Sequence, residues 1–344
     1  MKRCAYVALL VMLMFSSPHA EEPILTGPAV KELGGDPPAA PMGYPNSTAL
    51  FAAIKLGIVK LVDLEAPLPD SVELRSDVEY GKVGDRSLKL DLYSPKVRTE
   101  KLPLLVFIHG GGWKGGKKED YKLYTQVFAT KGYVVASVGY RLTGEAKFPA
   151  CVNDVKCAIR YLRSNAAALG VDAERIGVVG GSAGGHLAMM IGYSSDIPEL
   201  EGDGGNPGVS SHVKAVVNIY GPTNLNDDFI RKNANANQLI ESLFGQAVAD
   251  AGDLLDQASP GFYLDAKDPP TLILHGTIDD IVPVDQSDQL AKKLTDLQIP
   301  YAYDRLPGWP HTMDLALDVN KRSTWLMERF FARYLRDELP AAGK

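Results

Sequence analysis

Short apolar runs alternate along the chain with longer segments that have helical periodicity. The apolar runs are rich in Val, Ile and Leu, and they lie at 104–108, 133–138, 176–179, 213–220 and 271–274; the stretch at 301–306 is expected to be the last strand. Runs of this kind predict strands that are buried in a sheet. Helices are expected between them, most clearly at about 150–168 and 322–335. Because strands that alternate with helices form βαβ units, we predict an α/β fold with a mostly parallel central sheet flanked by helices.

A different pattern precedes the first of these runs. Residues 87 to 93 alternate strictly between polar and apolar side chains, and a shorter stretch at 78–80 lies on the other side of Gly84 and Asp85. Strict alternation around a Gly-Asp turn indicates two strands that are buried on one face only. We therefore predict an antiparallel N-terminal hairpin at an edge of the sheet.

The first 46 residues have two distinct compositions. Lys2 and Arg3 precede an apolar run from about residue 5 to residue 15, and small residues follow up to Ala20. This order predicts a signal peptide over 1–20, cleaved after Ala20 and implying secretion to the periplasm or medium, with an uncleaved anchor as the alternative. Prolines and glycines dominate 21–46, which predicts a disordered leader without packed structure.

An apolar stretch at 47–62 follows the predicted leader. Ser47 or Thr48 could cap a helix over this stretch, which belongs to an N-terminal segment at 47–70. We expect this helix to be a cap or wall of the domain, and a mobile lid, a dimer contact or a membrane-surface helix are alternatives. A single catalytic domain is expected at 71–338, with polar insertions at 196–211 and 224–252 over or beside its site.

Charge and cysteine content narrow the function classes. The formal net charge is −6, and loss of Lys2 and Arg3 with the signal peptide takes it to −8. Mild acidity argues against a nucleic-acid partner or an anionic membrane surface. Cys151 and Cys157 lie six residues apart. On one helix that spacing separates them by about 9 Å, so we expect two free, buried thiols unless Cys151 precedes the helix.

The strongest chemical signal lies at the end of the run at 176–179. Residues 180–184 read Gly-Gly-Ser-Ala-Gly, and an apolar, helix-compatible segment follows. This matches G-x-S-x-G, the strand-to-helix elbow that exposes a nucleophilic serine. A phosphate-binding glycine turn is the alternative interpretation. The elbow makes Ser182 the candidate nucleophile, provided that the chain also supplies a base, an acid and an oxyanion hole.

One histidine is well placed to be the base. Of the six histidines, His311 lies in a loop after the last predicted strand, whereas the others lie in the signal peptide, the glycine run at 109–112, the helix after Ser182, or next to strands. The acid should come between Ser182 and His311 in the sequence. Asp279 and Asp280 follow the predicted strand at 271–274. We prefer Asp279, and Asp280 is the alternative.

The oxyanion hole is predicted from a glycine run. Residues 109–113 read His-Gly-Gly-Gly-Trp and follow a predicted strand. Glycines let the backbone bend so that its N–H groups can face a developing negative charge. We name the N–H groups of Gly111 and Gly112 as donors, together with that of Ala183, the residue after the nucleophile. No group of residues has the spacing of a metal site.

These motifs resemble those of the α/β-hydrolase superfamily. The chain is similar to esterases and lipases with the His-Gly-Gly-Gly-Trp motif, and particularly to the BD-FAE type, the bifunctional xylan deacetylases and feruloyl esterases. The similarity extends over about 72–335. Its motifs are Tyr140-Arg141-Leu142, Asp154, the Gly-Gly-Ser-Ala-Gly-Gly-His run at 180–186, Tyr220-Gly-Pro-Thr, Ala258-Ser-Pro and His-Gly-Thr-Ile-Asp at 275–279.

This resemblance implies an α/β-hydrolase fold and a secreted serine carboxylesterase. Ser182, Asp279 and His311 would form its triad, no cofactor would be needed, and Trp113, Tyr220 and Trp309 would contact substrate. The expected substrates are short-chain acyl or aryl esters, including acetyl or feruloyl groups on polysaccharides. The alternatives are a lipase-like esterase for longer acyl chains, a serine peptidase or arylformamidase, and an inactive hydrolase used as a binding module.

Overall fold

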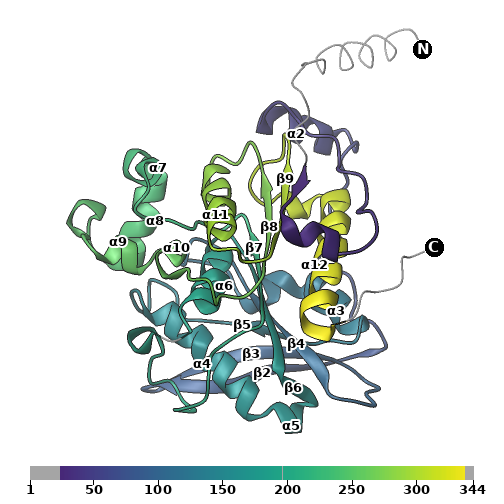
Figure 1. Ribbon diagram of the computed structural model, residues 1–344, viewed down its shortest axis with the longest axis vertical. Helices are drawn as coiled ribbons and strands as arrows, with labels where there is room; N and C mark the ends of the chain where they lie inside the picture. The colour runs from purple at the N-terminus through teal and green to yellow at the C-terminus, as the bar shows by residue number, and fades with distance from the viewer. Residues whose placement is uncertain (1–23, 196, 338–344) are drawn as a thin grey trace.

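The computed structural model describes residues 24–195 and 197–337, and a nine-stranded sheet forms its centre (Figure 1). The strands lie in the order β1-β9-β8-β7-β6-β4-β5-β3-β2. Their bounds are β1 (Leu25–Thr26), β2 (Val72–Val83), β3 (Arg86–Pro95), β4 (Leu102–Ile108), β5 (Val134–Val138), β6 (Val171–Gly181), β7 (Ala215–Ile219), β8 (Thr271–Gly276) and β9 (Tyr301–Leu306). The six strands β4 to β9 pair in parallel, as the apolar runs predict.

Helices cover both faces of this sheet. The α-helices are α2 (Ser47–Lys55), α3 (Lys122–Thr130), α4 (Ala150–Ser164), α5 (Ala166–Leu169), α6 (Ala183–Tyr193), α7 (Asp228–Lys232), α8 (Ala234–Phe244), α9 (Leu254–Gln257), α10 (Pro260–Tyr263), α11 (Asp285–Asp296) and α12 (Leu317–Arg336). Short 3₁₀ helices are η1 (Pro28–Glu32), η2 (Lys118–Tyr121), η3 (Pro198–Leu200), η4 (Val248–Asp250) and η5 (Met313–Leu315).

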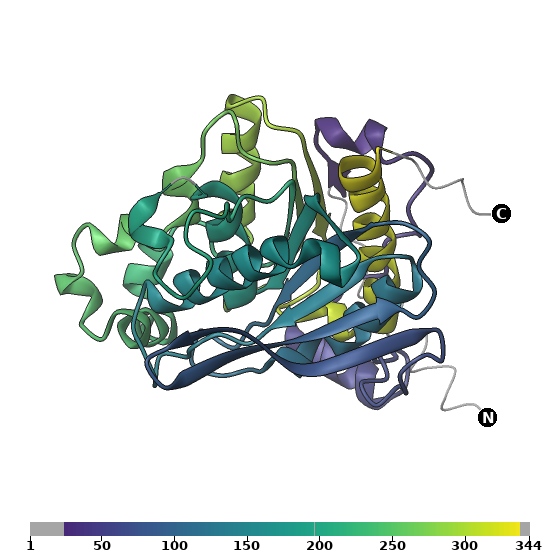
Figure 2. The ribbon, with the colours of Figure 1, turned by 90° about the horizontal axis from the view of Figure 1, so that it is seen from below.

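The hydrophobic core has two layers because successive side chains of a strand point to opposite faces. In β4, Val106 and Ile108 pack with residues of α4 and α6, whereas Leu105 and Phe107 pack with residues of α3 and α12. Figure 2 shows α12 and the α4–α6 pair on opposite sides of the sheet. The predicted mostly parallel α/β architecture is therefore confirmed.

The edges of the sheet are antiparallel. β2 and β3 form the predicted hairpin, and β3 pairs with β5 in the antiparallel sense. At the opposite edge, β1 pairs antiparallel with β9. β1 lies within the segment for which the sequence predicts no packed structure.

The expectation of a disordered leader is wrong for residues 24–46. Ala29 and Leu33 are 0 and 1% exposed, and Tyr44 packs edge-on against Trp309 with ring centroids 5.8 Å apart. Glu32 also forms an ion pair with Arg333 of α12. Proline and glycine disfavour regular structure, but they do not prevent an extended chain from docking its few apolar side chains onto an existing core.

The helix expected at 47–62 is shorter than predicted. Asn46, rather than Ser47 or Thr48, caps it, accepting a hydrogen bond from the N–H of Ala49. The helix ends at Lys55, and Gly57 then adopts a φ of 71°. A left-handed glycine just after a helix is a common stop signal. The chain continues extended, and Leu61 forms an isolated bridge with Ala316.

Cys151 and Cys157 are free and buried, as expected, and Cys151 lies within α4. The predicted signal peptide at 1–20 lies outside the described residues. Among residues 24–195 and 197–337, no helix has the length and apolar character needed to cross a membrane.

Candidate active site

Ser182 occupies a strained turn between β6 and α6. Its φ is 56°, a region that residues with a side chain rarely adopt. The turn is tight, since a Cβ on Gly180 would lie 2.1 Å from the carbonyl oxygen of Gly184. The N–H of Ser182 donates to the carbonyl of Ile219 at 2.9 Å, which joins the turn to β7. Backbone strain of this kind persists where the surrounding structure holds it, and it is frequent at active sites.

Two further predicted residues meet Ser182 at the carboxyl edge of the sheet. The Nε2 atom of His311 lies 2.9 Å from the Ser182 hydroxyl, and Nδ1 lies 2.6 Å from Oδ2 of Asp279. Because the carboxylate accepts a hydrogen bond from Nδ1–H, Nε2 carries no proton and is free to accept the serine proton. The three side chains therefore form one continuous hydrogen-bonded chain. Asp280, the alternative acid, is exposed to solvent.

The carboxylate of Asp279 is held by several donors. Its Oδ1 accepts the N–H groups of Ile281 and Val282, each at 2.9 Å, and Nε2 of His275 lies 3.2 Å from Oδ2. Burial by itself would raise the pKa of Asp279, but hydrogen bonds from His275 and His311 lower this pKa to about 2. Asp279 is consequently ionised at neutral pH and fixed in orientation.

His275 is a site residue that the sequence analysis did not identify. Its Nδ1 pairs with the Ser287 hydroxyl at 2.7 Å, and its Nε2 lies 2.9 Å from the carbonyl of Val282. These contacts orient Nε2 towards Asp279. The one sequence feature that could have pointed to this role is that His275 directly follows the predicted strand at 271–274, four residues before Asp279. A strand-end histidine reveals such a role only when its partners are known in space.

The glycine run after β4 passes directly beside the nucleophile. A Cβ on Gly110 would lie 3.3 Å from that of Ser182, and Gly111 and Gly112 have φ values of 105° and 59°. Within the described part of the chain, the N–H groups of Gly111 and Gly112 donate to no other residue. The N–H of Ala183 is in the first turn of α6, where helices leave their amides unpaired. The predicted oxyanion donors thus surround Ser182.

Two buried histidines support this loop. The indole N–H of Trp113 lies 3.3 Å from Nδ1 of His186, whose Nε2 lies 2.7 Å from the carbonyl of Ala258. Burial lowers the pKa of His186 to about 4, although the Ala258 carbonyl opposes the shift. His109 stacks on Tyr140 with ring centroids 4.3 Å apart. His186 and His109 are both buried in the domain, and their contacts support the glycine loop on the side facing the core.

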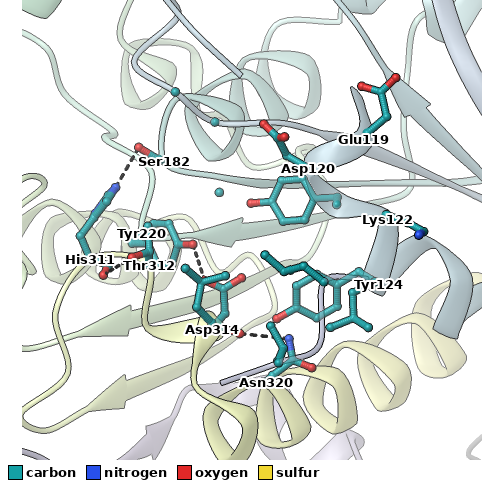
Figure 3. Close-up of a pocket in the computed structure, with 18 of the residues that line it drawn as sticks. Glu119, Asp120, Lys122, Tyr124, Ser182, Tyr220, His311, Thr312, Asp314 and Asn320 are labelled. Carbon is teal, nitrogen blue, oxygen red and sulfur yellow. Dashed lines mark hydrogen bonds between the residues drawn. The ribbon is translucent and has the colours of Figure 1, made fainter. Parts of the chain in front are cut away.

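A large cavity of about 810 Å³ opens at Ser182 and His311. Figure 3 shows Ser182 and His311 at one end and Glu119 and Lys122 at the other. Aromatic side chains, Tyr121, Tyr124 and Tyr220, form much of its floor. Val62 and Leu64 also line it, so the segment after α2 forms part of the cavity wall.

A buried tyrosine and carboxyl group interact at the floor of the large cavity. The Tyr220 hydroxyl donates to Oδ1 of Asp314 (Figure 3). Burial raises the pKa of Tyr220 far above its ordinary range and also raises the pKa of Asp314. The Tyr220 ring lies 4.6 Å from the His311 ring. Tyr220 therefore lines the large cavity beside His311, and its contact with substrate stays a prediction.

A second, small cavity of about 40 Å³ lies on the other side of the nucleophile. Ser182, Ala183 and Trp113 line it, together with residues of α8. Trp113 is thus placed at a cavity, as expected. Trp309 is not: its ring is 2% exposed, its N–H lies 3.3 Å from the carbonyl of Pro41, and it lines neither cavity. The structure therefore does not bring Trp309 to either cavity, because the N-terminal segment covers it.

No group of three or more His, Cys, Asp or Glu side chains in residues 24–195 and 197–337 is arranged to hold a metal ion. The chemistry available at the site is that of the serine, the imidazole, the carboxylate and the backbone donors. A nucleophile, a base with its orienting acid, and an oxyanion hole together are the parts needed for acyl transfer.

Comparison with known families agrees with this geometry. Residues 90–294 match the family described as BD-FAE. The chain belongs to the BD-FAE family. Esterase LipC of Mycobacterium tuberculosis (strain ATCC 25618 / H37Rv) is 31% identical over 246 residues, which are 70% of this chain and 60% of LipC. The chain therefore spans less than two thirds of that curated relative.

Solved structures of similar proteins share the fold. A bifunctional GH43-CE from Bacteroides eggerthii is 32% identical with a TM-score of 0.69, covering 76% of this chain and 38% of that one. A truncated carbohydrate esterase from gut microbiota is 28% identical with a TM-score of 0.66, covering 77% of this chain and 99% of that one. The α/β-hydrolase fold predicted from the resemblance is confirmed.

Proposed function

We propose that this BD-FAE family member is a serine carboxylesterase that hydrolyses short-chain acyl or aryl esters through an acyl-enzyme. The observation that carries the proposal is the hydrogen-bonded chain from Asp279 through His311 to Ser182, which ends beside unpaired backbone N–H groups. Two of the similar proteins support this proposal: LipC is named an esterase, and one structural neighbour is named a carbohydrate esterase.

The acylation step follows from the positions of these groups. The Ser182 oxygen attacks the ester carbonyl carbon while Nε2 of His311 takes its proton. Asp279 stabilises the imidazolium that forms, through the 2.6 Å contact to Nδ1. The former carbonyl oxygen becomes negative and faces the N–H groups of the glycine loop and Ala183. Collapse of this intermediate breaks the bond to the alcohol oxygen, which receives the proton from His311.

Deacylation repeats the sequence with water. His311 takes a proton from a water molecule, the resulting hydroxide attacks the acyl carbon, and the proton returns to Ser182 as the acid leaves. The oxyanion donors act in both steps because each has a tetrahedral intermediate. Removal of one such donor typically costs about 3 kcal/mol of transition-state stabilisation. The preorganised glycine loop is therefore expected to contribute as much as an acid-base residue.

We further propose that the alcohol part of the ester is rich in hydroxyl groups, as in acetyl or feruloyl groups on polysaccharides. The large cavity combines tyrosine side chains with Glu119, Asp120 and Lys122. Carboxylates accept hydrogen bonds from sugar hydroxyls, and the lysine ammonium group donates hydrogen bonds to them. Tyrosine rings can pack against the apolar face of a sugar. The names of the carbohydrate esterase and of the GH43-CE protein support this choice.

The test is hydrolysis of 4-nitrophenyl acetate by the wild type and by Ser182→Ala. We expect turnover by the wild type and a loss of about 10⁴-fold or more in the variant. Equal rates of turnover would refute the assignment of Ser182 as the esterase nucleophile, and no turnover by either protein would favour a binding module. Release of acetate from acetylated xylan, and of ferulate from methyl ferulate, then separates the carbohydrate substrates from lipase-like, peptidase or arylformamidase activity.

Export is a separate proposal, supported by the sequence of residues 1–20. A chain expressed with its own N-terminus should be recovered from the periplasm or medium, and its first residue should be Glu21. N-terminal sequencing of the recovered protein checks this. An intact Met1 terminus on membrane-bound protein would favour an uncleaved anchor instead.

A further inference from the structure

We propose that the small cavity beside Ala183 is the acyl site, and that Leu239 of α8 limits it to acetyl and propionyl groups. This inference rests on the proposed esterase function. It identifies which part of the substrate occupies which cavity, and it names a residue that determines acyl-chain specificity. Four observations carry it: the position of His311, the lining of the small cavity, its volume, and the contact between Leu239 and the glycine loop.

The position of His311 decides which cavity holds the alcohol. The leaving oxygen must come within hydrogen-bond distance of Nε2 to receive its proton. His311 lines the large cavity together with Thr312 and does not line the small one. The alcohol therefore occupies the large cavity. The acyl group, on the other side of the carbonyl carbon, extends into the small cavity that adjoins the nucleophile.

The lining of the small cavity suits an apolar chain. Apart from Ser182 and Gln286, its walls are glycine, proline and apolar side chains: Gly112, Trp113, Ala183, Pro222, Leu225, Ile230, Ala236, Leu239, Ile240, Ile281, Val282 and Pro283. The side-chain oxygen of Gln286 already accepts the N–H groups of Thr223 and Asn224, at 2.9 and 2.8 Å. Because this amide oxygen already accepts two hydrogen bonds from the backbone, it stabilises the cavity wall and is not a free acceptor for a ligand.

The volume of the small cavity restricts the acyl length. The cavity of about 40 Å³ is only a few times larger than the minimum of about 10–15 Å³ that a single water-sized group requires, so it suits a short acyl chain. The methyl group of acetyl and the ethyl group of propionyl fit within this space. A feruloyl group, which carries a substituted aromatic ring, is several times larger. Of the two polysaccharide substituents considered above, acetyl is the one that the cavity accommodates.

Leu239 forms the boundary between the two cavities. Leu239 lines both cavities, and so does Ile281, which lies in the loop after β8. A Cβ placed on Gly112 would lie 2.8 Å from Cδ2 of Leu239, so the leucine packs directly on the oxyanion loop. The neighbouring Ile240 and Leu243 are 2 and 1% exposed and anchor α8 in the core. Truncation of Leu239 would therefore enlarge the acyl site while the helix stays anchored.

The experiment compares kcat/KM for 4-nitrophenyl acetate, propionate, butyrate, hexanoate and octanoate, with the leaving group constant. For the wild type we expect the maximum at acetate or propionate and a fall of at least tenfold by hexanoate. In Leu239→Ala the hexanoate-to-acetate ratio should rise about tenfold, the usual effect of one or two methylenes in an apolar pocket. Leu243→Ala is the matched control, because it truncates a core-facing leucine of the same helix and should leave the ratio unchanged.

A second variant tests the same site in the opposite direction and does not depend on the folding of Leu239→Ala. Ala236→Leu adds bulk to the small cavity, and the propionate-to-acetate ratio should fall about tenfold. A wild-type maximum at hexanoate or longer, faster hydrolysis of methyl ferulate than of methyl acetate, or unchanged ratios in both variants would overturn the acyl-site assignment. Activity that survives in Ser182→Ala would instead overturn the esterase function, so the two failures are distinguishable.

Discussion

Nδ1 of His311 lies 2.6 Å from Oδ2 of Asp279, although Asp280 is adjacent in the sequence. The choice between the two aspartates is made by the backbone. Two N–H groups, those of Ile281 and Val282, donate to Oδ1 of Asp279 and turn its other oxygen towards the imidazole. Asp280 remains exposed. One carboxylate orients the base, and its neighbour contacts solvent.

Asparagine at 279 should therefore abolish most of the activity. Asp279→Asn keeps the shape of the side chain but no longer stabilises the imidazolium or the productive tautomer, and kcat for 4-nitrophenyl acetate should fall about 10⁴-fold. Asp280→Asn is the matched control, with kcat expected within twofold of the wild type. A comparable loss in both variants, or in Asp280→Asn alone, would contradict the assignment of the acid.

The glycine loop gives a second prediction. In Gly112→Ala the new Cβ would collide with Leu239, and alanine disfavours a φ of 59°. Displacement of this N–H should lower kcat by about 10²- to 10³-fold. Gly115→Ala serves as the control in the same loop, since its Cβ would meet only one atom, at 3.8 Å. Steady-state measurement of kcat for 4-nitrophenyl acetate in both variants tests this prediction. Similar kcat values for the two would argue against a role for the Gly112 amide.

His186 makes stability depend on pH. Burial lowers its pKa in the folded protein from 6.5 to about 4. Between these values the unfolded chain binds a proton that the folded protein excludes, so stability is fully present above about pH 6.5 and falls as the pH drops towards 4. A shift of this size corresponds to a loss on the order of 3 kcal/mol.

Urea unfolding at several pH values from 4.5 to 7.5 measures this loss for the wild type and His186→Gln. Glutamine does not titrate, so the free energy of unfolding should fall less steeply with decreasing pH in the variant. The difference between the two slopes removes the contributions of the other titratable groups, the buried His109 among them. Parallel slopes in the two proteins would show that His186 is not buried in its neutral form.

The N-terminal segment should contribute to stability. Leu33 is 1% exposed, and Leu33→Ala should lower the free energy of unfolding by about 2–5 kcal/mol. Met42 is 58% exposed, and Met42→Ala should change it by less than about 0.5 kcal/mol. Thermal or urea unfolding compares the two variants. Equal, small effects would indicate that the segment does not pack as the structure places it.

The predictions that succeeded rest on local patterns. The apolar runs identify the parallel strands, and G-x-S-x-G specifies the elbow because only a glycine-flanked serine fits between β6 and α6. Ser182, Asp279 and His311 each end or follow a strand, and parallel strands bring such positions to one edge. The fold and these three residues could therefore be predicted without coordinates.

The predictions that failed depend on contacts between distant parts of the chain. The sequence places Trp309 two residues before His311, which suggests a substrate contact, but in the structure Tyr44 packs against its ring. His275 gains its role only through Ser287, Val282 and Asp279. The boundary between the two cavities arises where Leu239 of α8 meets the glycine loop, and no sequence pattern encodes that packing. Local propensity cannot identify contacts that tertiary docking creates.

The most direct test of the account is the site of covalent labelling. A 4-nitrophenyl phosphonate ester should modify the chain once, and peptide mass spectrometry should find the phosphonyl group on Ser182, with complete loss of esterase activity. Ser182→Ala should remain unlabelled under the same conditions. Labelling at another residue, or full 4-nitrophenyl acetate turnover by protein that is labelled on Ser182, would contradict the claim that Ser182 is the nucleophile.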